Sequence, residues 1–180
     1  MPVKTFAVGE LVSATDVNTY MANPGLDYVK SQTIGTAVSS VEVTAAFSST
    51  YDAYVVVLAG GTSSGSPNIR MTLGASAASY YSGYIQVTYS TGAVAGGAVN
   101  NGAYWDLGGA RAGNPSLIIE LENPNLARPT SVRSFDATTV TYRQYGGYHN
   151  VSTAYTAFTL TPSTGTLTGG TIIVYGHRKA

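Results

Sequence analysis

One motif in this chain has the spacing of a catalytic serine. Gly61-Thr62-Ser63-Ser64-Gly65 fits the Gly-x-Ser-x-Gly pattern of a nucleophile elbow, and Asp136 and His149 follow in the order found in α/β-hydrolases. Such an elbow needs a strand before the serine and a helix after it. Here Ser66-Pro67-Asn68 and another strand-like run follow instead. Because the chain has 21 glycines, such a match arises easily, and the pattern favours a loop between strands.

A pair of carboxylates is a second candidate for chemistry. Glu120 and Glu122 lie two residues apart on one predicted strand, so both project from the same face, about 7 Å apart. Glycosidases use carboxylate pairs at comparable separations, but their two groups flank the scissile bond from opposite sides. Leu117, Ile119 and Leu121 take the inward positions. We therefore predict that both glutamates face solvent or a neighbouring subunit.

Aromatic residues form the best candidate for ligand contact. Tyr104-Trp105-Asp106 follows closely after Asn100-Asn101, and sugars are often held by an aromatic face together with Asn and Asp hydrogen bonds. Our candidate ligand-binding residues are therefore Asn100, Asn101, Tyr104, Trp105 and Asp106. The alternative is that the aromatic rings fill cross-strand pairs and buried interfaces. The sequence favours this alternative for the 14 tyrosines and leaves both open for Trp105.

Composition argues against several other classes of function. Cysteine is absent, and the two histidines, His149 and His177, have no partner at metal-ligand spacing, so we expect no metal and no cofactor. Nine Lys and Arg balance nine Asp and Glu without a basic cluster, so nucleic acid is not an expected partner. No apolar run approaches the roughly 18 residues of a membrane-spanning helix.

Short strand-like runs fill the chain from Thr33 onward and are separated by glycine-rich turns. No helical pattern interrupts them, which favours an all-β fold, an antiparallel β-sandwich of jelly-roll type. The predicted strands are 34–47, 51–59, 68–73, 82–89, 102–107, 117–122, 131–145, 154–161 and 171–175.

Residues 1–31 have a different pattern, which predicts an N-terminal arm with one short helix. Ser13 is a suitable N-cap, with Asp16 three residues on in the capping position. A helix of about ten residues is marginal alone, so it must dock, either on residues 32–180 or on a partner. The sequence does not decide between these two docking positions. Pro24 ends the helix, and its docking stripe would be Val17, Tyr20 and Met21.

The scarcity of charge indicates a subunit of an assembly. Charged residues make up only 10% of the chain, against about a quarter in ordinary soluble domains. Apolar residues are at a normal 44%, so the chain is not of the disordered type. A free monomer usually carries more charge to remain soluble. We therefore expect its neutral sheet faces to be covered by other protein.

A resemblance agrees with this expectation. Residues 6–23, Phe-Ala-Val-Gly-Glu-Leu-Val-Ser-Ala-Thr-Asp-Val-Asn-Thr-Tyr-Met-Ala-Asn, resemble the opening of many tailed-bacteriophage virion proteins. Residues 167–176 are similar to the closing strand of trimeric jelly-roll domains in phage tail tips, fibres and capsid decorations. Residues 51–58 and 116–124 fit two inner strands of that module. The resemblance implies a homotrimeric virion protein, and no binding residues carry over from it. The absence of cysteine suits a virion protein made in the host cytoplasm.

These observations predict a structural protein and not an enzyme. Our first expectation is a tail-tip or tail-fibre subunit of a tailed phage. It would assemble as a trimer and dock on other virion proteins through its arm, and a contact with host-surface glycan stays open. The alternative is a capsid decoration protein, of cement or head-fibre type, that stabilises the shell. A third hypothesis, from a different class, is a host-surface polysaccharide hydrolase.

Overall fold

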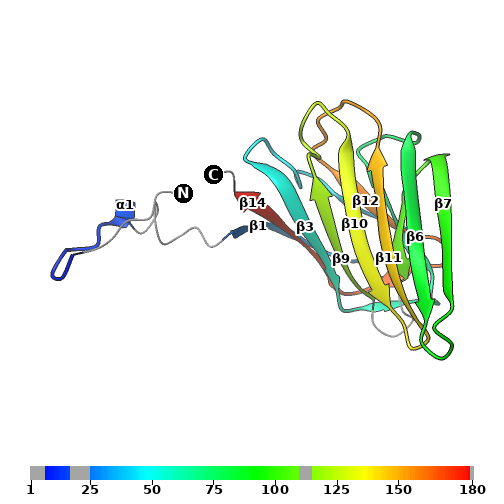
Figure 1. Cartoon of the computed structure of the whole chain (residues 1–180). Coiled ribbons are helices and arrows are strands. Elements are labelled where there is room, and N and C mark those ends of the chain that lie inside the picture. Colours follow the sequence, from blue (N-terminus) through cyan, green and yellow to red (C-terminus); the bar gives the residue numbers. More distant parts are fainter. Residues whose placement is uncertain (1–6, 17–24, 110–114, 179–180) are drawn as a thin grey trace.

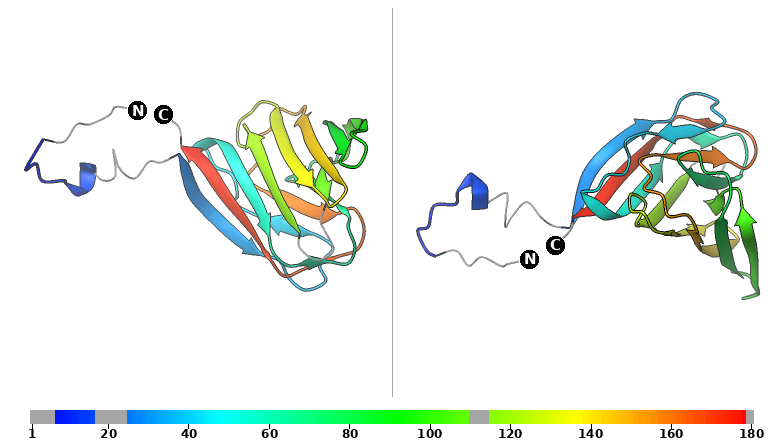
Figure 2. Two further views of the ribbon diagram at one scale, coloured as in Figure 1. Left: turned by 60° about the horizontal axis from the view of Figure 1, so that its bottom comes forward. Right: turned by 90° about the horizontal axis from the view of Figure 1, so that it is seen from above.

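The structure, a computed structural model, describes residues 7–16, 25–109 and 115–178 (Figure 1). Apart from one short helical segment, their regular elements are antiparallel strands in two main sheets and a two-stranded ribbon. The main sheets face each other across a common core (Figure 2). The predicted fold class, an all-β antiparallel sandwich, is confirmed, and the arrangement is compatible with the jelly-roll type.

The large sheet has eight strands, and most of its neighbours are far apart in the sequence. The first and last of the described strands lie side by side at one end, and a late hairpin pairs with an earlier one at the other end. In spatial order the strands are β1 (Leu26–Thr33), β14 (Thr171–Arg178), β3 (Tyr51–Ala59), β9 (Ser116–Glu122), β10 (Thr130–Ala137), β11 (Thr141–His149), β6 (Tyr80–Thr88) and β7 (Val94–Gly102).

The small sheet covers one face of the large one and is shorter. Its four strands, in spatial order, are β2 (Val41–Val43), β12 (Phe158–Pro162), β5 (Asn68–Leu73) and β8 (Trp105–Gly109). The ribbon pairs β4 (Thr62–Ser63) with β13 (Leu167–Thr168). We call the side of the large sheet that is turned away from the small sheet its outer face.

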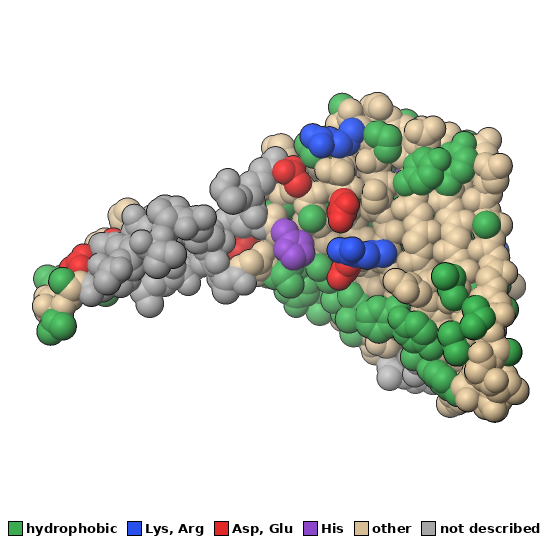
Figure 3. Space-filling model, in the orientation of Figure 1, with side chains coloured by type: hydrophobic (Ala, Val, Ile, Leu, Met, Phe, Trp, Pro, Cys, Tyr) green, Lys and Arg blue, Asp and Glu red, His purple; other side chains and the backbone are tan. Residues whose placement is uncertain are grey.

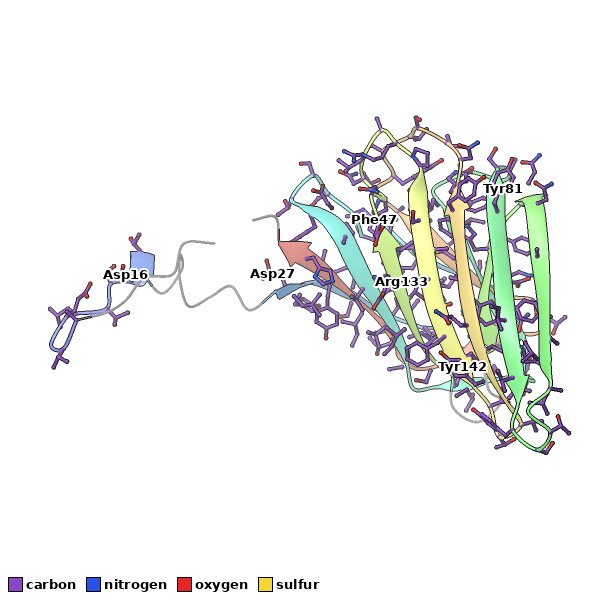
Figure 4. The ribbon with its side chains drawn as sticks, in the orientation of Figure 1. Asp16, Asp27, Phe47, Tyr81, Arg133 and Tyr142 are labelled. Carbon is purple, nitrogen blue, oxygen red and sulfur yellow. The ribbon has the colours of Figure 1, made fainter. Side chains whose placement is uncertain are left out.

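Strict alternation of apolar side chains builds the core between the sheets. In β3 the inward residues Tyr54, Val56 and Leu58 are almost completely buried, and their neighbours in sequence are only partly buried. Burial of each such side chain contributes about 1.5–3 kcal/mol. Aromatic rings fill one end of the core, where Phe47 stacks on Phe158 with ring centroids 5.5 Å apart (Figure 4).

The predicted start of the N-terminal helix is present. Helix α1 (Ala14–Asp16) begins after Ser13, whose Oγ accepts a hydrogen bond from the Asp16 backbone N–H at 3.1 Å. The Ser13 N–H donates in return to Asp16 Oδ2 at 3.1 Å, which completes a capping box. The proposed docking residues, Val17, Tyr20 and Met21, lie outside the described residues.

Strand β1 extends the sandwich into the segment that the sequence assigned to the arm. It begins at Leu26 and pairs with β14 from Leu26 opposite His177 to Thr33 opposite Thr171. The sheet therefore starts before residue 32. The sequence signal was weak because β1 is an edge strand whose apolar residues are not confined to one face, and Leu26 and Tyr28 are exposed.

Three other strand predictions need correction, each for a local reason. The run 34–47 forms only the short β2, because Ala37 and Ala45 adopt positive φ angles of 53° and 48° and interrupt pairing. The run 131–145 is a hairpin, with a turn in which Thr138 Oγ1 accepts from the Thr141 N–H at 2.9 Å. Strand β7 was not predicted, because glycine and alanine have low strand propensity.

Candidate functional site

The outer face of the large sheet carries an exposed apolar row. The row consists of residues that lie opposite one another on successive strands, and it runs from β14 to the β6–β7 edge (Figure 3). Ile118, Phe135 and Ile85 are 40%, 51% and 61% exposed. We define the apolar row as Ile173, Val57, Ile118, Phe135 and Ile85, with Gln144 between Phe135 and Ile85.

A small charged cluster lies one step further along the strands. Arg133 forms an ion pair with Glu120 on the neighbouring strand, and its Nη2 is 3.9 Å from Glu122 Oε1 (Figure 4). All three side chains are about half exposed or more. Exposed pairs of this kind contribute about 0–1 kcal/mol. As predicted from the alternation of β9, both glutamates project from the outer face, and the arginine contacts both of them.

Glycines create a shallow depression beside this cluster. Gly83 and Gly146 lie opposite each other on β6 and β11 and leave the sheet backbone uncovered. The open depression has a volume of about 440 Å³ and is bordered by Arg133, Gln144 and Ile85. Along the same strands, the rings of Tyr81 and Tyr148 stack with centroids 4.8 Å apart. This part of the outer face is therefore a wide, shallow depression in which backbone, aromatic and apolar groups are available for contact.

Trp105 does not take part in an exposed ligand site. Its side chain is fully buried in the core, and its Nε1–H donates to the Tyr148 carbonyl at 3.2 Å. The ring packs edge-on against Tyr80, with centroids 5.1 Å apart. A buried indole cannot offer a face to a sugar, so the ligand-contact interpretation of Trp105 is wrong. The competing interpretation, that the ring is a core residue, is the one that the structure supports.

The other four candidate ligand residues are divided between separate local contacts. Asp106 pairs with Arg70 at 3.4 Å, and the Arg70 guanidinium lies over the Tyr104 ring, 4.2 Å from its centroid. Asn101 has a positive φ of 58°, and its Oδ1 accepts from the Ser79 N–H at 3.0 Å. Asn100 is exposed on β7. Tyr104 and Asp106 therefore share Arg70 as a partner, whereas Asn101 stabilises a turn, and the four residues do not form one common site.

The structure also separates the three residues of the hydrolase pattern. Ser63 Oγ donates to the Gly65 carbonyl at 2.5 Å, on the short β4. Asp136 is paired with Arg143, and both ring nitrogens of His149 have other partners. After Ser63 the chain continues through a turn into strand β5. Ser63, Asp136 and His149 therefore do not form a triad in this conformation.

His149 is a buried polar residue whose hydrogen bonds are satisfied in the neutral state. Its Nδ1 lies 3.2 Å from the Ser79 carbonyl, which can only accept, so this nitrogen carries the proton. Nε2 then accepts from the Tyr155 hydroxyl at 2.8 Å. Burial lowers the pKa of His149 below its ordinary value, and the bond to Ser79 opposes this change. Protonation of the ring is thus coupled to unfolding.

We expect acid to destabilise the fold through His149. Because burial lowers its folded-state pKa, the unfolded chain binds the extra proton more readily, and stability falls as the pH drops below about 6.5. The slope contributed by this residue reaches at most about 1.4 kcal/mol per pH unit. Urea unfolding of the wild type and of His149→Gln at a series of pH values measures it. The variant should lose this part of the slope, and His177→Gln, at an exposed position, should keep it. Equal slopes for wild type and His149→Gln would contradict this assignment.

Several kinds of site are not found in the described part of the chain. Residues 7–16, 25–109 and 115–178 contain no group of three or more His, Cys, Asp or Glu that could hold a metal ion. Among the same residues, no helix has the length and apolar character needed to cross a membrane. No family model, no curated protein and no solved structure matches the chain significantly.

Sequence reasoning missed the apolar row, although one signal for it was present. Leu117-Ile118-Ile119 is a continuous apolar run, which places apolar side chains on both faces of β9. A strand that is apolar on both faces is usually covered on both. The outer face of the large sheet is therefore the surface that most resembles a binding site.

Proposed function

We propose that this chain is a structural subunit of a tailed-phage particle and that other protein covers the outer face of its large sheet. The observation that carries the proposal is the apolar row, which crosses the sheet at one level, is interrupted by Gln144, and includes the exposed side chains of Ile118, Phe135 and Ile85. Exposed apolar surface of this kind, bordered by polar groups, marks protein interaction sites. Further support comes from the low charge content of 10%.

The identity of the particle rests on the resemblance of residues 6–23 to the opening of phage virion proteins. The resemblance of residues 167–176 to the closing strand of trimeric jelly-roll domains in tail tips, fibres and capsid decorations supports a homotrimer, and of these positions we favour the tail tip or tail fibre. In this arrangement the apolar row packs between copies, and the polar groups at its border, such as Arg133 and Gln144, lie at the rim. The depression over Gly83 and Gly146 accepts side chains of the neighbouring subunit.

A charge placed in the apolar row should disrupt the assembly. We expect the wild type to sediment as a trimer at micromolar concentration and Phe135→Asp to weaken association by about 30-fold or more, since central interface residues often contribute about 2 kcal/mol or more. Val140→Asp is the matched control, because Val140 is a similarly exposed apolar residue in the β10–β11 turn. Analytical ultracentrifugation over a concentration series measures both.

Different results test the contact between copies, the role of the apolar row and the virion assignment separately. A folded wild type that stays monomeric over the whole series would refute burial of the outer face between copies. Equal weakening by Phe135→Asp and Val140→Asp would refute the role of the apolar row. For the virion assignment, the chain should be found in purified phage particles by mass spectrometry. Antibody labelling in electron microscopy should then place it at the tail, and labelling of the head would favour the decoration protein instead.

A further inference from the structure

Strand β7 is an unprotected edge of the large sheet. It pairs with β6 on one side, and no other described strand pairs with it. Its nine residues contain no charged residue and no proline, and nearly all of them are exposed. Natural edge strands are usually short, bulged, charged or covered, because a free row of N–H and C=O groups recruits another strand. This edge has a length and composition that permit such pairing (Figure 1).

The opposite edge of the same sheet, strand β1, is bulged in its middle and carries charged residues, whereas the bulge of β7 lies near its end, between Val99 and Gly102, and leaves residues 94–99 regularly paired. Strand β1 has a register shift between Tyr28 and Lys30, which interrupts its edge. Lys30 Nζ donates to the Thr44 carbonyl at 2.6 Å, so the charge is held beside the strand. Asp27 Oδ2 accepts from the Tyr51 hydroxyl at 3.3 Å. Residues 94–99 of β7, which are regular and carry no charge, are therefore better suited to pairing than β1.

The side chains of β7 identify a second copy of this chain as the partner. Residues 94–99, Val-Ala-Gly-Gly-Ala-Val, are all small and neutral. An antiparallel copy can therefore pair with them without like charges or bulky side chains in conflict. Val94 and Val99 are 71% and 37% exposed and would gain apolar contacts.

The register follows from the requirement that the sheet be continuous. Gly96 lies opposite Ile85 and continues the apolar row, and Val94 and Ala98 project from the same face because strand residues alternate. Outward residues must face outward residues across the new pair. With Gly96 opposite Gly96, the two apolar rows join, and Val94 of each copy lies opposite Ala98 of the other.

We infer that β7 pairs antiparallel with β7 of a second copy about a two-fold axis at Gly96, which joins two large sheets into one. This inference deepens the proposed function by naming a contact between copies. It is separate from burial of the outer face, because backbone groups of the edge make it. A two-fold edge contact also differs in symmetry from the proposed trimer, so the two contacts together would link trimers.

Disulfide cross-linking tests the inference directly, because the chain has no native cysteine. Val94→Cys and Ala98→Cys chains, distinguished by tags, are mixed under mild oxidation. Directly opposite strand residues have the spacing of a disulfide, whereas the same position in two copies is displaced along the strands. We expect the mixture to give at least about tenfold more cross-linked dimer than either variant alone.

Controls separate this contact from the outer-face contact. Ser31→Cys, on the protected edge strand β1, is exposed and should not cross-link to Ala98→Cys. The same mixture is repeated with Phe135→Asp in both chains, and circular dichroism confirms that all variants are folded. If Val94→Cys chains still cross-link to Ala98→Cys chains when both carry Phe135→Asp, the β7 pair is supported even if the outer-face proposal fails. Absence of the Val94–Ala98 cross-link, or equal cross-linking to Ser31→Cys, would overturn the inference.

Discussion

Trp105→Ala should lower the free energy of unfolding by about 3–5 kcal/mol, the usual loss when a large buried aromatic side chain is removed. The indole is fully buried and packs edge-on against Tyr80, and it lies 6.1 Å from His149 between ring centroids. Its removal leaves a cavity and deletes the hydrogen bond from the indole to the Tyr148 carbonyl. Because this residue lies between the sheets, the effect is on stability and on the geometry of the core.

Urea unfolding followed by far-ultraviolet circular dichroism measures this loss, since the variant has no tryptophan to report by fluorescence. The matched control is Tyr104→Ala, whose ring is only partly buried and lies under Arg70, and whose loss should be markedly smaller. If Trp105→Ala unfolds like the wild type but loses binding to a glycan, the buried position described for the indole would be refuted.

Arg143→Ala should also cost about 3–5 kcal/mol, because it removes the partner of a buried carboxylate. Asp136 is only 2% exposed, and its Oδ2 accepts from Arg143 Nη2 at 2.5 Å. The isolated carboxylate would remain between the sheets without its counter-charge. Arg133→Ala is the matched control, because the ion pairs of Arg133 are exposed and should contribute only about 0–1 kcal/mol.

Urea is the suitable denaturant for this comparison, since guanidinium salts screen ion pairs. A double variant, Asp136→Leu with Arg143→Met, provides a further check. It removes both charges together, so it should lose less stability than Arg143→Ala alone. A loss for Arg143→Ala no greater than that for Arg133→Ala would contradict the importance of the buried pair.

Strands with one buried face were predicted well from the sequence. Strands β3 and β5 have the predicted bounds, because Tyr54, Val56 and Leu58, like Ile69 and Met71, alternate with less buried neighbours. The alternation is imposed by the core and is therefore visible in the sequence. The two edge strands, β1 and β7, have no such constraint along much of their length. Both were missed or assigned elsewhere for that reason.

The apolar row could not be predicted from the sequence because its residues come from different strands. The apolar row joins residues that are distant in the chain, such as Val57, Ile118 and Ile173, and only the register of the strands aligns them. Spacing within one strand cannot reveal a cross-strand row. Trp105 illustrates the opposite case, in which a residue type typical of sugar contacts lies next to polar residues but points into the core.

The position of β14 sets the order in which this fold can be completed. Among the described strands it comes last in the sequence, yet it lies between β1 and β3 and hydrogen-bonds to both. During synthesis β1 must therefore wait, without a neighbour, until residues 171–178 have left the ribosome. Closure over such sequence separations is slow, and open strand edges favour misassociation in the meantime. We expect the nascent chain to become competent for assembly only after translation has passed β14.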